Sequence, residues 1–206
     1  MYNPRHFQMN EAGQAARLIA ENPLSALIGP DEQGRSFVSH LPLTLIEEPA
    51  EDGAGWRLEG HMARANPHWP WLASQQEVLA VFTGPDAYIS PRHYDTQLAV
   101  PTWNYLAVHV YGRLTLVEGR EEKDSLLKRL ITPHDPDYVA QWSGLPEDFK
   151  HKLLDAIQGF CIEVTHWEGK AKISQNRAAA ERERIHEEST PEMRRWMERL
   201  RADDPR

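Results

Sequence analysis

The chain has 206 residues, of which 40% are hydrophobic and 26% charged, an ordinary composition for a globular protein with a buried core. Its 31 acidic and 23 basic residues give a formal net charge of −8, which disfavours general nucleic-acid binding because that binding depends on cations that neutralise phosphates. The single cysteine, Cys161, excludes an intramolecular disulfide, and with no N-terminal apolar run and no long apolar segment it predicts a cytoplasmic protein without a membrane span.

The N-terminal half of the chain predicts one helix followed by short strands. Asn10 is a suitable N-cap for a helix that continues to Asn22, where Pro23 ends it, and alanines at helical spacing give this helix an apolar stripe. A second, short helix is expected at residues 66–71. Strands are expected at residues 24–28, 36–41, 43–47, 56–61, 78–82 and 87–90, with glycine and proline at the turns between them.

The clearest strand signal is the alternation of apolar and mixed side chains over residues 105–117, where Gly112 marks a bulge or bend that suits barrel closure. Helices at 121–130 and 146–157 and a strand at 161–167 follow. The stretch 177–188 is rich in alanine and charge, and Thr190-Pro191 opens a last helix. Many short strands with helices inserted between them predict an α+β barrel that is mostly β. The last helix carries an apolar stripe of Met193, Trp196, Met197 and Leu200.

Several sequence signatures of enzymes are missing. There is no phosphate loop, no GxGxxG after a strand, no HExxH and no CxxC. Cys161 lies among apolar neighbours in a predicted strand, which is typical of a buried structural thiol. His61 and His68 lack a second ligand pair at helical spacing, so no metal site is expected.

The segment from Gly60 to Trp69 is the first candidate binding site. It places His61 and Arg64 between the end of a strand and the start of a helix. An imidazole and a guanidinium beside helix-start N–H groups can hold a phosphate monoester. The alternative is a capped turn with Arg64 in a surface salt bridge.

Two further segments carry polar and aromatic side chains beside strands. Trp103 and Asn104 precede the strongest strand, where they can flank and hydrogen-bond a flat heteroaromatic ring or simply belong to the core. The run 169–176 follows a strand and groups two lysines with polar donors. It reads either as a solvated loop or as a segment that closes over an anionic or electron-rich ligand.

Six motifs in a fixed order cover nearly the whole chain. They are Met1-Tyr2-x-Pro4-x-His6-Phe7, Ser39-His40-Leu41-Pro42, Gly60-His61-x-Ala63-Arg64-Ala65-Asn66-Pro67-His68-Trp69, Phe82-x-Gly84-Pro85-x-Ala87-Tyr88-Ile89-Ser90-Pro91, Val100-Pro101-Thr102-Trp103-Asn104-Tyr105 and Gly169-Lys170-x-Lys172-Ile173-Ser174-Gln175-Asn176. This order resembles the PaiB family of FMN-binding proteins. One departure is Arg92-His93, where family members often carry an aromatic residue, so substrate-side contacts are the least secure part of the resemblance.

The resemblance implies an FMN-binding split β-barrel with inserted helices and a helical C-terminal tail, the fold of pyridoxamine-phosphate oxidases and flavin reductases. It implies a barrel domain at 1–176 and a helical extension at 177–206 packed on the barrel or on a partner subunit. It also implies a homodimer with the flavin at the dimer interface. The implied cofactor contacts are His61 and Arg64 at the phosphate, Asn66 shaping the turn, Ser39 and His40 beside the same cofactor, Trp103, Asn104 and Tyr105 at the ring or ligand side, and Lys170, Lys172, Ser174 and Gln175 from the same or the partner subunit.

Three functions stay open at this point. The first is an FMN-dependent oxidoreductase, such as an NAD(P)H-dependent flavin or ferric reductase, for which no catalytic residue is named because the flavin performs the chemistry. The second is a flavin-bound negative transcriptional regulator, although the sequence shows no DNA-binding module and direct DNA binding is not expected. The third is a haem-binding split barrel with His40, His93 or His109 as axial ligand.

Overall fold

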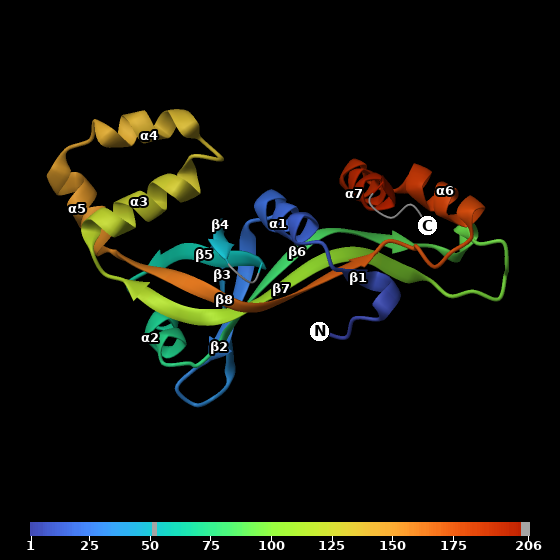
Figure 1. Cartoon of the computed structure of the whole chain (residues 1–206), viewed down its shortest axis with the longest axis horizontal. Helices are drawn as coiled ribbons and strands as arrows, with labels where there is room; N and C mark the ends of the chain where they lie inside the picture. Colours follow the sequence, from blue (N-terminus) through green and yellow to red (C-terminus); the bar gives the residue numbers. More distant parts are fainter. Residues whose placement is uncertain (51–52, 203–206) are drawn as a thin grey trace. The chain divides into compact units, whose positions relative to one another are not determined.

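The computed structural model describes residues 1–50 and 53–202 and divides the chain into two compact units (Figure 1). Unit 1 comprises Met1–Leu18, Thr83–Val108 and Glu168–Arg206, and unit 2 comprises Ile19–Phe82 and His109–Trp167. The three long strands β6 (Val78–Ile89), β7 (Thr102–Val117) and β8 (Ile157–Lys172) contribute residues to both units.

In unit 2, seven strands lie side by side in one sheet in the order β3-β2-β6-β7-β8-β5-β4. The strand pairs β2–β3, β2–β6, β4–β5 and β5–β8 are all antiparallel. No hydrogen-bonded pair joins β3 to β4 within residues 1–50 and 53–202, so the sheet is open. This arrangement confirms the predicted α+β, mostly β fold. The remaining strands of the run are β2 (Leu24–Pro30), β3 (Ser36–Pro42), β4 (Thr44–Ala50) and β5 (Gly53–Ala63).

Alternating burial explains why these segments form strands. In β2, Ser25, Leu27 and Gly29 are buried, whereas the residues between them are more exposed. Period-two alternation of this kind places one face of a strand against the core. The fully buried side chains of unit 2 include Leu27, Leu58, Phe82, Phe160 and Ile162.

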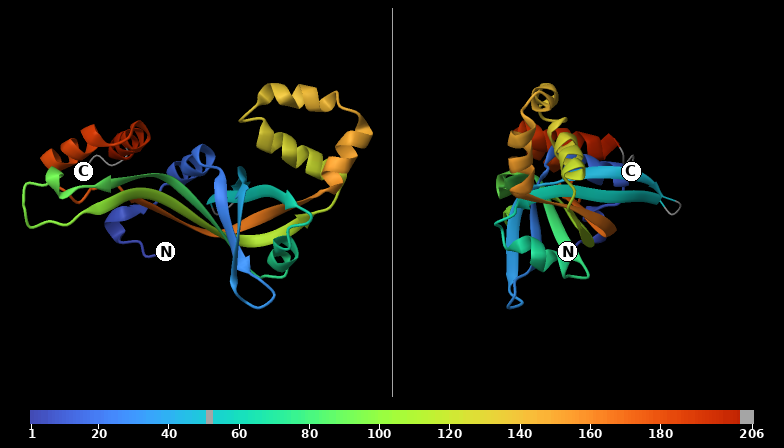
Figure 2. Two further views of the ribbon diagram at one scale, coloured as in Figure 1. Left: turned by 180° about the vertical axis from the view of Figure 1, so that it is seen from behind. Right: turned by 90° about the vertical axis from the view of Figure 1, so that its left-hand side faces the viewer.

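The helices of unit 2 pack against two different pairs or groups of elements. The short α2 (His68–Ala73) contacts β2 and β3, and α3 (Arg120–Ile131) contacts β5. Both α4 (Pro136–Ser143) and α5 (Glu147–Asp155) contact α3, and Figure 2 shows these three helices grouped together. Helix α4 was not predicted, although Asp135 caps it by accepting a hydrogen bond from the Tyr138 amide and Pro136 occupies its first turn.

Unit 1 holds the N-terminal segment and the two C-terminal helices. Its β1 (Gln8–Met9) pairs antiparallel with β8, and α1 (Ala12–Glu21) begins in this unit. The helices α6 (Ala179–Glu188) and α7 (Pro191–Ala202) contact each other. Three stripe residues of α7, Met193, Trp196 and Met197, are buried. The proposed boundary at residue 176 stays a prediction, and residues 203–206 of the expected extension lie outside the described residues.

Most predicted strands were too short, and two of them differ most. The segments 78–82 and 87–90 lie in the single strand β6. Gly84 in its middle lets Leu18 of α1 pack closely on the strand, since a Cβ there would lie 2.6 Å from Leu18 Cδ1. The strand predicted at 161–167 extends over 157–172, so Lys170 and Lys172 belong to β8 and not to a loop. Within the described ranges, no helix is long and apolar enough to cross a membrane.

Candidate functional site

The twelve predicted cofactor contacts fall into two groups, one in each unit. Unit 2 contains Ser39, His40, His61, Arg64 and Asn66. Unit 1 contains Trp103, Asn104, Tyr105, Lys170, Lys172, Ser174 and Gln175. Each group has its own local network of contacts.

Asn66 organises the turn between β5 and α2. Its side-chain oxygen accepts the His68 N–H at 3.0 Å, and its Nδ2 donates to Ser39 Oγ at 3.1 Å. Ser39 Oγ also lies 2.8 Å from His68 Nδ1 in a buried contact. Ser39 is therefore engaged within the chain, and the hydroxyl ties β3 to the start of α2.

His68 is a central residue of this turn that was not among the predicted contacts. Its ring is fully buried and lies 4.7 Å from the ring of Phe37, measured between centroids. Burial lowers the pKa of His68 to about 4, so the imidazole is neutral near pH 7. Its Nε2 is buried without a hydrogen-bond partner. His68 stands inside the Asn66-Pro67-His68 motif, but spacing alone does not reveal which histidine the fold buries.

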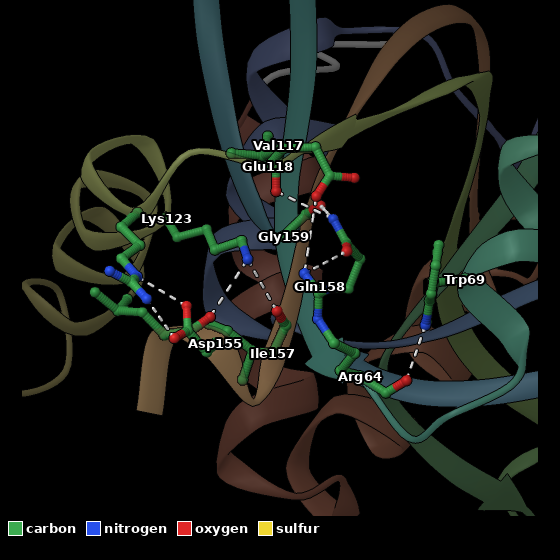
Figure 3. A network of polar contacts seen from close by, with 11 residues as sticks. Arg64, Trp69, Val117, Glu118, Lys123, Asp155, Ile157, Gln158 and Gly159 are labelled. Atoms are coloured by element: carbon green, nitrogen blue, oxygen red, sulfur yellow. Dashed lines mark hydrogen bonds and ion pairs between the residues drawn. The ribbon is translucent and has the colours of Figure 1, made fainter. Parts of the chain in front are cut away.

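Arg64 directly follows β5, and its backbone is held in place on both sides (Figure 3). The Arg64 amide donates to the Ala156 carbonyl at 2.8 Å, and the Trp69 indole N–H donates to the Arg64 carbonyl at 3.0 Å. The guanidinium donates through Nη2 to Gln158 Oε1 at 3.1 Å and lies 3.8 Å from Glu118 Oε2. The Arg64 side chain is 46% exposed to solvent, which leaves N–H groups available to an anion.

The two predicted histidines of unit 2 lie in different surroundings. His61, on β5, is half-buried, burial lowers its pKa, and its Nδ1 has no partner. A neutral His61 can offer a hydrogen bond to a phosphate but no positive charge. His40, on β3, is exposed.

A buried lysine, Lys123, lies beside the Arg64 network and was not predicted. The Lys123 side chain is fully buried, and Nζ donates to the carbonyls of Leu154 at 3.3 Å and Ile157 at 3.1 Å. Burial, and then the neighbouring Arg64 charge, lower the pKa of Lys123. Because these carbonyls lie at the end of α5 and the start of β8, Lys123 fixes the backbone that leads into Gln158 (Figure 3).

In unit 1, Lys170 is enclosed by aromatic rings. Its Nζ donates to the Tyr2 carbonyl at 2.9 Å and lies 5.1 Å from the centre of the Tyr105 ring. This geometry is a cation–π contact. Lys172 donates to the Thr102 hydroxyl. Both lysines are thus engaged within unit 1.

Asn104 is the most informative predicted contact of unit 1. It is fully buried, its Oδ1 accepts from Ser174 Oγ at 2.9 Å, and its Nδ2 has no partner. Ser174 adopts a left-handed backbone conformation with φ of 63°. The Gln175 side chain bonds to nearby backbone, since its Nε2 donates to the Ala171 carbonyl at 2.6 Å. Trp103 is 53% exposed and packs edge-on against Tyr88.

Unit 2 also contains a cavity of about 730 Å³ between α3 and the strands β5, β7 and β8. Glu59 lies in its wall, almost fully buried, and accepts two hydrogen bonds from Arg129 at 2.6 and 3.0 Å. The half-buried Cys161, whose thiol pKa is raised by burial, also contributes to the wall. Of the predicted contacts, none lines this cavity. Among the described residues, no group of His, Cys, Asp and Glu has the geometry of a metal site.

Residues 1–166 match the family described as "Putative FMN-binding domain". Over 179 residues the chain is 33% identical to Protease synthase and sporulation protein PAI 2 of Bacillus subtilis (strain 168), with 86% of this chain and 83% of the relative covered. The FAD and heme binding protein from Mycobacterium smegmatis has a similar structure, with a TM-score of 0.65, 15% identity, and coverage of 86% of this chain and 78% of that chain. The flavocytochrome Anf3 from Azotobacter vinelandii gives a TM-score of 0.61 at 16% identity, covering 82% and 71%. At these identities the structural likeness shows the fold alone, which is the split barrel of flavin-binding proteins with an open sheet.

Proposed function

Because the chain belongs to the PaiB family of proteins with an FMN-binding domain, we propose that it binds FMN and that Arg64 holds the FMN phosphate. One observation carries this proposal: a half-exposed guanidinium at the end of β5 whose orientation is held by the buried amide of Gln158. Phosphate oxygens bind guanidinium groups through paired, charge-assisted hydrogen bonds. The chain therefore has an oriented cation within the motif that we propose binds the phosphate.

The other residues of unit 2 refine this phosphate site. His61 is neutral near pH 7, so we propose that it supplies a hydrogen bond and that the positive charge comes from Arg64. Both polar atoms of the Asn66 side chain are already hydrogen-bonded, Nδ2 to Ser39 Oγ and Oδ1 to the His68 N–H at the start of α2. Its role is to shape the turn, and Ser39 supports Asn66. The exposed His40 stays available to a ligand on β3.

The unit 1 group is proposed separately as a ligand-binding group. The unpartnered Nδ2 of the buried Asn104 is a donor that a carbonyl of a flat heterocycle would satisfy. The exposed face of Trp103 is suited to stacking on such a ring. Lys170, Lys172, Ser174 and Gln175 are proposed to support these two residues, because their polar atoms already bind within unit 1. Tyr105 is proposed to support them through the cation–π contact of its ring with Lys170.

For the activity, we propose an FMN-dependent oxidoreductase with a reduced nicotinamide as electron donor. When bound, the flavin supplies the electron-accepting and electron-donating chemistry. The chain's contribution is to bind and orient the cofactor, and no side chain is assigned as a catalytic acid or base.

Two measurements test this function in order. The purified protein is expected to quench the fluorescence of added FMN, and the mixture is expected to oxidise NAD(P)H faster than free FMN does. If FMN fluorescence is not quenched, the cofactor assignment is wrong. If FMN binds but NAD(P)H oxidation equals that of free FMN, the oxidoreductase assignment is wrong and the binding function stands.

A regulatory role is the second candidate, favoured by the 33% identity to the PAI 2 protein, whose name concerns protease synthesis and sporulation. We propose that such regulation acts without direct DNA binding, because the net charge of −8 opposes phosphate-backbone contact. A salt-sensitive, sequence-dependent gel shift by the purified protein would overturn that mechanism.

A haem-binding function is the third candidate, favoured only by the names of the two similar structures. His93 is buried and lies 3.8 Å from Glu188, whereas His40 is exposed. A Soret band on haem titration that is lost in His40→Ala, His93→Ala or His109→Ala supports this candidate, and an unchanged haem spectrum rejects it.

We further propose that the protein is a homodimer. The segment 88–103 of unit 1 exposes four large apolar side chains, Tyr88, Leu98, Val100 and Trp103, with exposed fractions of 53–96%. Exposed apolar groups gathered in one segment are typical of interaction surfaces. Sedimentation at micromolar concentration is expected to give a dimer, and the double substitution Leu98→Lys, Val100→Lys is expected to give a monomer. A monomeric wild type rejects this proposal.

A further inference from the structure

We infer that Gln158 is a positioning residue that holds the Arg64 guanidinium ready for an anionic phosphate oxygen. Gln158 belongs to none of the six sequence motifs, and it is fully buried near the start of β8. This inference rests on the proposed binding of the FMN phosphate by Arg64, and it explains how the chain raises its affinity for that phosphate.

The surroundings of Gln158 determine the orientation of its amide. Nε2 donates to the Val117 carbonyl and to the Gly159 carbonyl, each at 3.1 Å (Figure 3). Carbonyl oxygens accept only, so the nitrogen of the amide must face both of them. The amide oxygen therefore faces away from these carbonyls and toward Arg64, whose Nη2 donates to it at 3.1 Å.

The backbone around Gln158 is itself rigidly held. Lys123 Nζ donates to the carbonyl of Ile157, the preceding residue, at 3.1 Å. Gly159, the following residue, is closely packed, because a Cβ there would lie 3.3 Å from both Lys123 Cγ and Val117 Cβ, tighter than most such contacts. A guanidinium anchored to this amide loses little conformational entropy when an anion binds.

A neutral acceptor also leaves the charge of Arg64 available. Gln158 occupies one N–H of the guanidinium, which has five, and it cancels none of the positive charge. Glu118 is the alternative acceptor, but its carboxylate is 65% exposed and lies 3.8 Å away. Exposed ion pairs contribute little free energy, so a phosphate can displace Glu118 more easily than it could displace a buried carboxylate.

The test compares FMN with riboflavin, which lacks the phosphate. Dissociation constants for both are measured by flavin fluorescence quenching in the wild type, Arg64→Ala, Gln158→Met and the double variant. Because each protein sample binds both ligands, the ratio of the two constants does not depend on the fraction of folded protein. Gln75→Met is the matched control, since the Gln75 amide also donates to a backbone carbonyl, that of Trp71, and its second acceptor is Ser74 Oγ.

We expect Arg64→Ala to weaken FMN binding about 10- to 100-fold and riboflavin binding little. Gln158→Met is expected to weaken FMN binding about 3- to 10-fold, again with little effect on riboflavin. In the Arg64→Ala background, Gln158→Met is expected to leave the FMN-to-riboflavin ratio unchanged, because Gln158 acts through Arg64. The control should match the wild type.

Failure of the inference and failure of the proposed function give different results. If Arg64→Ala leaves the ratio unchanged, or if the wild type binds neither flavin, the phosphate site itself is wrong. If Arg64→Ala raises the FMN-to-riboflavin ratio of dissociation constants but Gln158→Met does not, or if Gln158→Met raises it equally in both backgrounds, only the positioning role is wrong. Should Gln158→Met fail to fold, Gln158→Asn keeps an amide for the carbonyls but withdraws its oxygen from Arg64, and the same outcomes apply to it.

Discussion

Ser39 Oγ and His68 Nδ1 lie 2.8 Å apart in a fully buried contact that joins β3 to the first residue of α2. Ser39 Oγ also accepts from Asn66 Nδ2. The hydroxyl can then donate its proton to His68 Nδ1, which is consistent with the low pKa of the ring and places the imidazole proton on Nε2. The turn that presents Arg64 is therefore built around a histidine that must stay neutral.

This arrangement predicts that acidification destabilises the protein between pH 6.5 and 4. The pKa of His68 falls from 6.5 to about 4 on folding, so in this window the unfolded chain binds more protons than the folded chain. The free energy of unfolding should drop as the pH falls, by up to about 3 kcal/mol for this group. His61, whose pKa is also lowered, acts in the same direction.

Urea unfolding at several pH values between 7 and 4 measures this slope. His68→Gln is expected to reduce the slope, whereas the exposed control His134→Gln should retain it. Equal slopes in the wild type and in His68→Gln would show that His68 titrates normally in the folded state.

The ion pair between Glu59 and Arg129 predicts a stability loss that an exposed pair does not share. Glu59 is almost fully buried, and Arg129→Ala would leave its carboxylate with Arg57, 3.1 Å away, as the remaining cation. We expect a loss of about 1–3 kcal/mol in the free energy of unfolding, because a buried carboxylate loses two charge-assisted hydrogen bonds. Arg120→Ala removes the half-exposed pair with Asp155 and is expected to cost much less. Similar losses for the two variants in urea unfolding would contradict the role of burial.

Gly60, next to His61 on β5, is predicted to tolerate no side chain. A Cβ at this position would lie 2.4 Å from Leu43 Cδ2 and 2.9 Å from Phe160 Cζ, both in the core. Gly60→Ala should therefore cost about 1–3 kcal/mol through overpacking. Gly13→Ala is the matched control in α1, where a Cβ meets nothing within 4 Å, and helix propensity predicts a gain of up to about 1 kcal/mol. Thermal unfolding of both variants checks the two signs, and a neutral Gly60→Ala would mean that Leu43 moves aside.

The sequence predicted those features of the fold that depend on local pattern. Alternation over residues 105–117 indicated β7, and the Asn66-Pro67 pair indicated α2, because each signal depends on neighbouring residues. The helix α4 was missed although Asp135-Pro136 is a start signal, because its short apolar pattern is weak.

The site was predictable only in part, because its decisive contacts join distant residues. Arg64 stands out in its motif, but Gln158 lies 94 positions further along the chain and follows no motif. In the sequence, Lys123 is one of many charged residues in a helix that is expected to be exposed. Only the packing of α5 against α3 shows that this lysine is buried. Spacing could not show that His61 and His68 lose their charge, since burial is a property of the packed fold.

Ser174 offers a last prediction, because two different effects at this residue can be separated by two substitutions. Its φ of 63° is unfavourable for any residue except glycine and asparagine, and its hydroxyl donates to the buried Asn104 Oδ1. Ser174→Ala keeps the unfavourable backbone and leaves Asn104 with two unpaired atoms, so we expect a loss of about 1–3 kcal/mol. Ser174→Gly loses the same hydrogen bond but relieves the backbone, and it should be about 1 kcal/mol more stable than Ser174→Ala. Urea unfolding of both variants checks this order, and equal stabilities would mean that the left-handed conformation costs nothing here.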